Sequence, residues 1–211
     1  MKKHKSLLVV FLAFIMMFMI ASSVSAASAK KEEKQVRKTM NGFISVVKNY
    51  NPSKIRSYFV RPSYAKVFLQ KRYTAKVIRT INKRYFTAHI DSIRVKKKTA
   101  TVVISGQHFS DMDACEKALD DMFLDILSHP HASSLKLDKR FAQNYSTYIK
   151  KDLAFYTDDA EGFNYVFISN YRLKISLKKV GRKWKISKKM NVDFLDAIHA
   201  DYESAYLDYF D

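Results

Sequence analysis

The first third of the chain carries apolar side chains at helical spacing. Residues 30–49 place five of them on one face, which predicts an amphipathic helix: Val36, Met40, Phe43, Ile44 and Val47. The segment Asn51-Pro52-Ser53 interrupts that pattern, and a short helix is predicted to follow it. A third helix is predicted from Pro62, which suits a first helical turn, to about residue 85. Its inward-facing residues are predicted to be Tyr64, Val67, Phe68, Ile78, Ile81 and Tyr85.

From residue 86 onward the pattern changes to alternation, which is typical of strands. One hairpin is predicted from residues 86–95 and 99–109, joined by a turn of lysines at 96–98. A second hairpin is predicted to open after Gly162 and to turn at residues 180–182. Its apolar face is expected to consist of Tyr171, Leu173, Ile175, Leu177, Trp184 and Ile186.

Helical spacing returns between the two hairpins and at the C-terminus. Asp111 is placed to cap a helix over residues 112–128, which His129-Pro130 would end. Further helices are predicted over about 138–156 and over 191–211. The predicted fold class is therefore α+β. N-terminal helices pack on a curved antiparallel sheet made of two long hairpins, with a helical insertion between the hairpins and a C-terminal helix.

The first 26 residues have the layout of a secretory signal peptide. A basic start precedes an uninterrupted apolar run from Leu7 to Ile20, and Val24-Ser25-Ala26 offers a small-residue cleavage site. A retained membrane anchor is the alternative, but a membrane span needs about 20 apolar residues. We therefore expect cleavage after Ala26, no transmembrane span after processing, and a secreted, extracellular product. The product is expected to be a single α+β domain over residues 27–211.

The composition supports one folded domain without a disulfide framework. The chain has 211 residues, of which 47% are hydrophobic and 14% aromatic, and it contains a single cysteine. That cysteine, Cys115, falls on the apolar stripe of the helix predicted over 112–128. A small buried hydrophobic side chain is therefore favoured over a reactive thiol.

Two segments resemble a known family. The segment Leu173 to Ile186 reads Leu-Lys-Ile-Ser-Leu-Lys-Lys-Val-Gly-Arg-Lys-Trp-Lys-Ile. It is similar to the final hairpin of secreted bacterial nuclear transport factor 2-like (cystatin-like) domains of unknown function, and the helix break at residues 51–55 is similar to theirs. The resemblance implies a cone-shaped half-barrel over helices, often with a pocket. It implies no particular function, because this fold hosts isomerases, dehydratases and binding modules. The helical stretch 111–156 is longer than in a minimal member.

An enzyme of this fold would need a buried acid or base in the pocket, and three strand residues are candidates: His89, Asp91 and His108. His89 and Asp91 share a predicted strand face with the apolar residues that follow them, so they could both face inward. Solvent-facing or hairpin-end positions are the simpler interpretation. His129 and His131 lack a third ligand at metal-site spacing, so a helix-breaking turn is favoured there. No catalytic residue, metal or cofactor is predicted.

Charge is the most informative feature of the composition. The formal net charge is +18, and residues 30–98 contain 20 basic and 3 acidic side chains. Residues 193–211 contain acidic side chains and no Lys or Arg, so the charge is polarised along the chain. The candidate polyanion-binding residues form a stripe on the third helix and a ladder on the second hairpin. They are Arg72, Lys76, Arg79 and Lys83, and Arg172, Lys174, Lys178, Lys183 and Lys185.

These basic surfaces favour a secreted, non-enzymatic binding module whose partner is an anionic wall polymer or an acidic glycan. Nucleic acid is disfavoured, because most tyrosines fall at core-facing positions and not among the basic residues. A lysine-rich solvated surface without a specific partner is an equal alternative. A second alternative is a small-ligand pocket protein or an isomerase-like enzyme of the same fold. The sequence leaves the ligand and the oligomeric state open.

Overall fold

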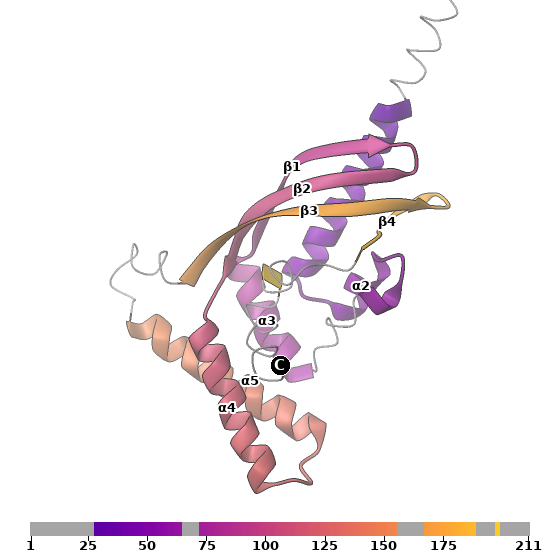
Figure 1. Cartoon of the computed structure of the whole chain (residues 1–211). Coiled ribbons are helices and arrows are strands. Elements are labelled where there is room, and N and C mark those ends of the chain that lie inside the picture. The colour runs from indigo at the N-terminus through magenta and orange to yellow at the C-terminus, as the bar shows by residue number, and fades with distance from the viewer. Residues whose placement is uncertain (1–27, 65–71, 156–166, 189–196, 199–211) are drawn as a thin grey trace, which may run out of the picture.

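The computed structural model describes residues 28–64, 72–155, 167–188 and 197–198 (Figure 1). The described elements combine helices with a four-stranded antiparallel sheet, so the predicted α+β class is confirmed. A helix over residues 28–48, here called the N-terminal helix, comes first. The elements that follow it are α2 (Pro52–Ser57), α3 (Arg72–Tyr85), β1 (Thr87–Lys96), β2 (Thr99–Phe109), α4 (Met112–Ser128), α5 (Ser134–Phe155), β3 (Ile168–Val180) and β4 (Lys183–Ile186).

The sheet has the strand order β1-β2-β3-β4, and each neighbouring pair is antiparallel. β2 pairs with β3 along its whole length, from Thr99 opposite Lys178 to Phe109 opposite Ile168. The two strands curve together across Figure 1. Both predicted hairpins are therefore present, and β2 and β3 join them into one sheet. The predicted opening of the second hairpin at Gly162 lies outside the described residues.

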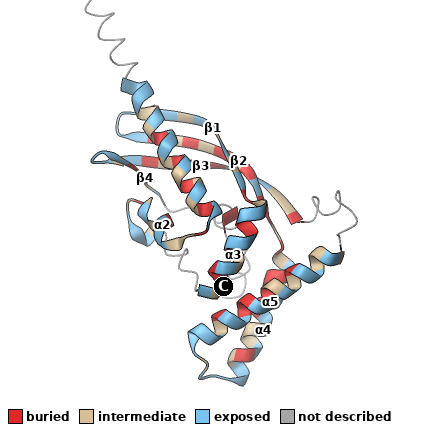
Figure 2. Ribbon diagram, turned by 180° about the vertical axis from the view of Figure 1, so that it is seen from behind, coloured by how far each residue is buried: buried red, intermediate tan, exposed pale blue. Residues whose placement is uncertain are grey.

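The N-terminal helix covers one face of this sheet (Figure 2). Four of its apolar residues are fully buried: Val36, Met40, Phe43 and Val47. They share a hydrophobic core with the inward-facing strand residues, which include Val102, Ile104, Tyr171, Leu173, Ile175, Leu177, Trp184 and Ile186. The polar residues between them on β3 stay exposed or half-buried. The predicted inner and outer faces of the second hairpin are confirmed.

The segment after the N-terminal helix is tied to the edge of the sheet. Asn51 caps α2, because its side chain accepts a hydrogen bond of 3.1 Å from the Lys54 backbone N–H. Past the end of α2, the Ile186 N–H donates to the Tyr58 carbonyl at 2.8 Å, and the Val60 N–H donates to the Ile186 carbonyl at 2.9 Å. These bonds hold α2 beside β4.

Helices α4 and α5 form a hairpin that extends away from the sheet (Figure 1). It has its own hydrophobic cluster, in which Cys115 is fully buried, as predicted. Asp111 caps α4 by accepting from the Ala114 N–H at 3.1 Å, which confirms the predicted cap. α5 begins at Ser134, four residues before the predicted start near 138. The Ser133 hydroxyl accepts from the Lys136 N–H at 3.3 Å and caps this earlier turn.

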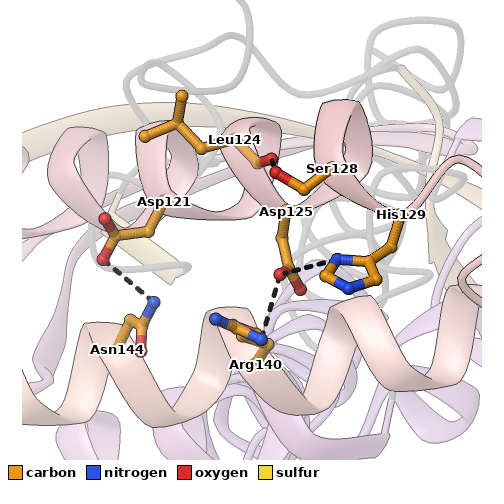
Figure 3. A network of polar contacts seen from close by, with 7 residues as sticks. All are labelled: Asp121, Leu124, Asp125, Ser128, His129, Arg140 and Asn144. Carbon is orange, nitrogen blue, oxygen red and sulfur yellow. Dashed lines mark hydrogen bonds and ion pairs between the residues drawn. The ribbon is translucent and has the colours of Figure 1, made fainter.

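Polar contacts join α4 to α5 along the hairpin (Figure 3). The Asp125 carboxylate accepts from Arg140 at 2.9 Å and lies 3.7 Å from the His129 ring nitrogen. One turn away, Asp121 accepts hydrogen bonds from Asn144 at 2.9 Å and from the Tyr148 hydroxyl at 2.7 Å. Asp125 is buried, so its ion pair with Arg140 offsets the cost of removing a carboxylate from water. His129 belongs to this structural network.

Asp138 fixes the hairpin to the rest of the protein. Its buried carboxylate accepts hydrogen bonds from the backbone N–H groups of Tyr73 and Thr74 and from the Thr74 hydroxyl, at 2.8, 3.2 and 2.6 Å. These donors lie in the first turn of α3, where helical N–H groups have no partner within the helix. An aspartate from α5 therefore caps α3.

Some predicted helical residues fall beyond what the structure describes. Residues 62–64 form a single helical turn, and α3 is described from Arg72; Val67 and Phe68 lie between, outside the described residues. Of the C-terminal helix predicted over 191–211, only Ala197 and Ile198 are described, and both are helical and buried. The Asn82 side chain donates to the Ile198 carbonyl at 2.6 Å, which places this segment against α3.

Candidate functional site

A groove of about 600 Å³ lies between the N-terminal helix, α2 and the β3–β4 hairpin. Small-molecule sites commonly have volumes in this range. The segments that line it are far apart in the sequence, and the hydrophobic core brings them together. The lining residues are Gln35, Lys38 and Thr39 from the helix, Ser57 and Tyr58 at the end of α2, and Arg182, Lys183, Trp184 and Lys185 from the hairpin.

The N-terminal helix supplies one wall of the groove. Gln35, Lys38 and Thr39 stand at positions i, i+3 and i+4, a spacing that puts them on one face of the helix. The adjoining face holds Val36 and Met40, which are fully buried against the sheet. Burial of the apolar face fixes the rotation of the helix and turns the polar row toward the groove.

The β3–β4 hairpin supplies the opposite wall. Gly181 has φ +59° in the turn, a left-handed conformation that suits glycine, and the basic residues Arg182 and Lys183 follow it directly. The Lys185 ammonium donates to the Ser57 carbonyl at 2.8 Å. That bond ties the strand to the end of α2 and holds this lysine at the rim of the groove.

Tyr58 lies where the two walls approach each other. Its ring packs edge-on against Phe43, with 5.5 Å between the ring centroids. A Cβ atom at Gly42 would lie 2.7 Å from the Tyr58 hydroxyl, which is too close for a non-bonded contact. The absence of a side chain at Gly42 therefore lets the hydroxyl of Tyr58 rest against the N-terminal helix, one turn beyond Thr39.

Trp184 belongs both to the core and to the groove. It is 3% exposed, and its indole N–H donates to the Glu32 carboxylate at 3.0 Å. The Lys179 ammonium donates to the other oxygen of the same carboxylate. The hydrogen bond from Lys179, opposed by desolvation and helped by the bond from Trp184, holds the pKa of Glu32 below its usual value of 4.5. Glu32 is thus ionised and already paired.

The groove is strongly cationic. Lys38, Arg182, Lys183 and Lys185 are four of its nine lining residues, and none of the nine is acidic. Among the described residues, no carboxylate forms an ion pair with any of these four side chains. Like charges around one depression repel one another, and a bound anion would relieve that repulsion. The arrangement suits a ligand with several negative charges.

The four residues of the predicted helical stripe are all exposed on α3: Arg72, Lys76, Arg79 and Lys83. Two of them have structural contacts as well. The Arg72 guanidinium lies 5.8 Å from the centroid of the Tyr73 ring. Arg79 donates to the carbonyls of Asn49 and Tyr50 at 3.0 and 3.5 Å, just past the C-terminal end of the N-terminal helix, where a cation is favoured by the helix dipole. All four are exposed and can meet a ligand, but α3 is not part of the groove.

The predicted ladder on the second hairpin divides into two parts. Arg172, Lys174 and Lys178 are exposed on the face of β3 that the N-terminal helix leaves uncovered. Arg172 is partly neutralised there, because its guanidinium lies 3.3 Å from the Asp91 carboxylate. Lys183 and Lys185 line the groove instead. The structure therefore places the nine predicted cations on α3, on the outer face of β3 and in the groove.

His89 and Asp91 do not face inward together with His108, so they take the solvent-facing positions that were the simpler interpretation of the sequence. β1 has a register shift between Ile90 and Ser92, so strict alternation breaks at Asp91. Before the shift the even-numbered residues face the core, and after it the odd-numbered ones do. His89 is consequently exposed, and Asp91 lies on the outer face, where it accepts from the Ser105 hydroxyl at 2.6 Å.

His108 does face inward and is 7% exposed. Its ring lies 6.0 Å, centroid to centroid, from that of Tyr171. The Tyr171 hydroxyl donates to the Thr87 carbonyl at 2.6 Å, and burial raises the pKa of Tyr171 far above its usual value. This pair of rings forms part of the packing between strands, and the structure does not bring the three pocket candidates into one constellation.

Six groove residues were not predicted from the sequence: Gln35, Lys38, Thr39, Ser57, Tyr58 and Arg182. A partial signal was present, because Arg182, Lys183 and Lys185 concentrate three cations around one tight turn. The polar row on the N-terminal helix looks like any solvated helix face until the position of the hairpin is known. Trp184 was predicted only as a core residue, which it is.

Comparisons with known proteins give no match: no family model, no curated protein and no solved structure resembles the chain significantly. The described helices include none whose length and apolar character would let it cross a membrane. The described residues also contain no cluster of three or more His, Cys, Asp or Glu side chains arranged to hold a metal ion.

Proposed function

We propose that this protein is an exported, non-enzymatic binding module that holds an anionic wall polymer or acidic glycan, with the cationic groove as its anchor. One observation carries the proposal: four basic side chains converge on one groove whose lining contains no carboxylate. A solvated lysine-rich surface has no reason to gather its charges in a depression. Membership of the nuclear transport factor 2-like family stays a prediction beside this proposal.

The charge outside the groove supports the same function. Exposed cations on α3 and on the outer face of β3 extend the positive potential beyond the groove. Such a potential attracts a flexible polyanion over about 8–10 Å at moderate salt, whereas close contact in a concave site gives register and selectivity. The stripe and the ladder would then guide the polymer, and the groove would hold it.

The alternative enzyme function has less support. An enzyme of this kind would need several polar side chains together on the inner face of the sheet. His108 lies on that face, but His89 and Asp91 lie on the outer face. A binding function needs no such constellation.

Export is part of the proposal and rests on the first 26 residues, which lie outside the described part of the chain. N-terminal sequencing of the protein recovered from the culture medium or the cell envelope tests it. We expect a mature chain that begins at Ala27. Recovery of the chain with Met1 intact in the cell interior would contradict the proposal.

The binding function is tested by removing equal charge from two places. One variant carries Lys38→Gln, Arg182→Gln and Lys183→Gln in the groove, and the matched control carries Arg72→Gln, Lys76→Gln and Lys83→Gln on α3. Binding to a soluble polyanion is measured over a series of salt concentrations, because each ionic contact releases counterions and adds about one unit to the slope of log affinity against log salt.

We expect the groove variant to lose about two to three units of that slope and the α3 variant less than one. Both variants should keep the melting temperature of the wild type, since exposed charges contribute little to folding. Equal losses in the two variants would mean that diffuse charge alone causes binding. Absence of binding by the wild type would remove the proposed function.

A further inference from the structure

Beyond its charges, the groove contains uncharged polar side chains without partners. In the part of the chain that the structure describes, the side chains of Gln35, Thr39 and Tyr58 make no hydrogen bond. The carboxamide oxygen of Gln35 is in addition shielded from solvent. A shielded carboxamide oxygen normally has a hydrogen-bond partner. The hydroxyls of Thr39 and Tyr58 are partly exposed, so they can bond to water or to a ligand.

The three groups form a row. Gln35 and Thr39 are one turn apart on the N-terminal helix, and the Tyr58 hydroxyl rests against that helix at Gly42, a further turn along. At a rise of 1.5 Å per residue, the row from position 35 to position 42 is about 10 Å long. Arg182, Lys183 and Lys185 belong to the wall that faces it. One side of the groove is therefore cationic, and the other offers hydrogen bonds, with Lys38 as its only charge.

From this two-sided arrangement we infer that the groove binds a polyanion that also carries free hydroxyl groups, in other words a polyol or sugar-based polymer. The inference rests on the proposed function and names its ligand class. The phosphate or carboxylate groups would contact the cationic wall. The ligand hydroxyls would exchange hydrogen bonds with the hydroxyls of Thr39 and Tyr58, which can both donate and accept. A polyanion without hydroxyls leaves the second wall unsatisfied.

The test separates hydroxyl recognition from charge. The variant Thr39→Val with Tyr58→Phe removes two hydroxyls and no charge. Its matched control is Thr101→Val with Tyr73→Phe, because Thr101 on β2 and Tyr73 on α3 lie outside the groove lining. Dissociation constants are measured at one salt concentration for three soluble probes. They are poly(glycerol phosphate), hyaluronate as a carboxylate glycan, and inorganic polyphosphate, which has no carbon-bound hydroxyls.

We expect the wild type to bind at least one hydroxylated probe more tightly than polyphosphate. The groove variant should weaken that binding by about tenfold, the effect of losing two hydrogen bonds, and leave polyphosphate binding unchanged. The control should change neither. Whether poly(glycerol phosphate) or hyaluronate shows the effect distinguishes phosphate from carboxylate as the anionic group.

Two results would overturn the inference while leaving the proposed function intact. The first is equal affinity of the wild type for polyphosphate and for both hydroxylated probes. The second is an equal loss of affinity for all three probes in the groove variant, which would indicate a change of groove shape. Failure of the wild type to bind any probe would overturn the proposed function together with the inference.

Discussion

At the scale of single residues, the groove is held in shape from its core side. Trp184 is buried, yet its indole N–H reaches the Glu32 carboxylate, and Lys179 binds the same carboxylate. Glu32 therefore joins the N-terminal helix to the β3–β4 hairpin beside the groove. Because Lys179 is committed to this contact, its charge is compensated, unlike the charges that line the groove.

This contact gives a pH-dependent signal. The folded state lowers the pKa of Glu32 from 4.5, so the stabilisation that it contributes is present above that value and is lost as the pH falls through the folded-state pKa. Trp184 is the only tryptophan, so fluorescence reports the contact directly. We expect an emission change with a midpoint below 4.5 that is absent in Glu32→Gln, while far-ultraviolet circular dichroism stays constant. A midpoint above 4.5, or one that Glu32→Gln leaves unchanged, would show that this carboxylate is not held as described.

Sequence periodicity could not place every residue. It assigned the apolar face of β3 and β4 correctly, because alternation runs unbroken along the predicted stretch. It left the facing of His89 and Asp91 open, because a register shift leaves no distinctive residue type: Asp91 looks like any polar strand residue. One extra residue in a strand reverses the facing of all residues on one side of it.

At the scale of elements, the helices and hairpins were predictable because each carries its own periodic signal and caps. Asp111 and Asn51 are local caps, and both act on the helix that follows them. The cap on α3 is not local, since Asp138 comes from α5, 64 or 65 positions away. The groove is non-local in the same way, because residues 35–39, 57–58 and 182–185 are far apart in the sequence and come together only in the folded protein. Periodicity gives no information on which elements will be neighbours.

At the scale of the whole molecule, the excess of positive charge is distributed unevenly. The described structure places cations on α3, on the outer face of β3 and around the groove, while α4 carries five acidic side chains and one lysine. The α4–α5 hairpin extends away from the sheet (Figure 1). Its acidic residues therefore do not neutralise the groove, and a polyanion would approach the molecule from the side of the sheet and the N-terminal helix.

The central claim, that the groove anchors an anionic polymer, is tested most directly by lysine footprinting. An acetylating reagent modifies exposed lysines, and mass spectrometry measures the rate at each position with and without a saturating soluble polyanion. Lys38 and Lys183 in the groove and Lys76 and Lys83 on α3 are all exposed in the unbound protein, so each can serve as a probe. We predict at least about tenfold protection of Lys38 and Lys183, the amount expected when a ligand occupies their site nine-tenths of the time or more, and weak protection of Lys76 and Lys83. Equal protection at all four positions, or protection confined to α3, would contradict the account.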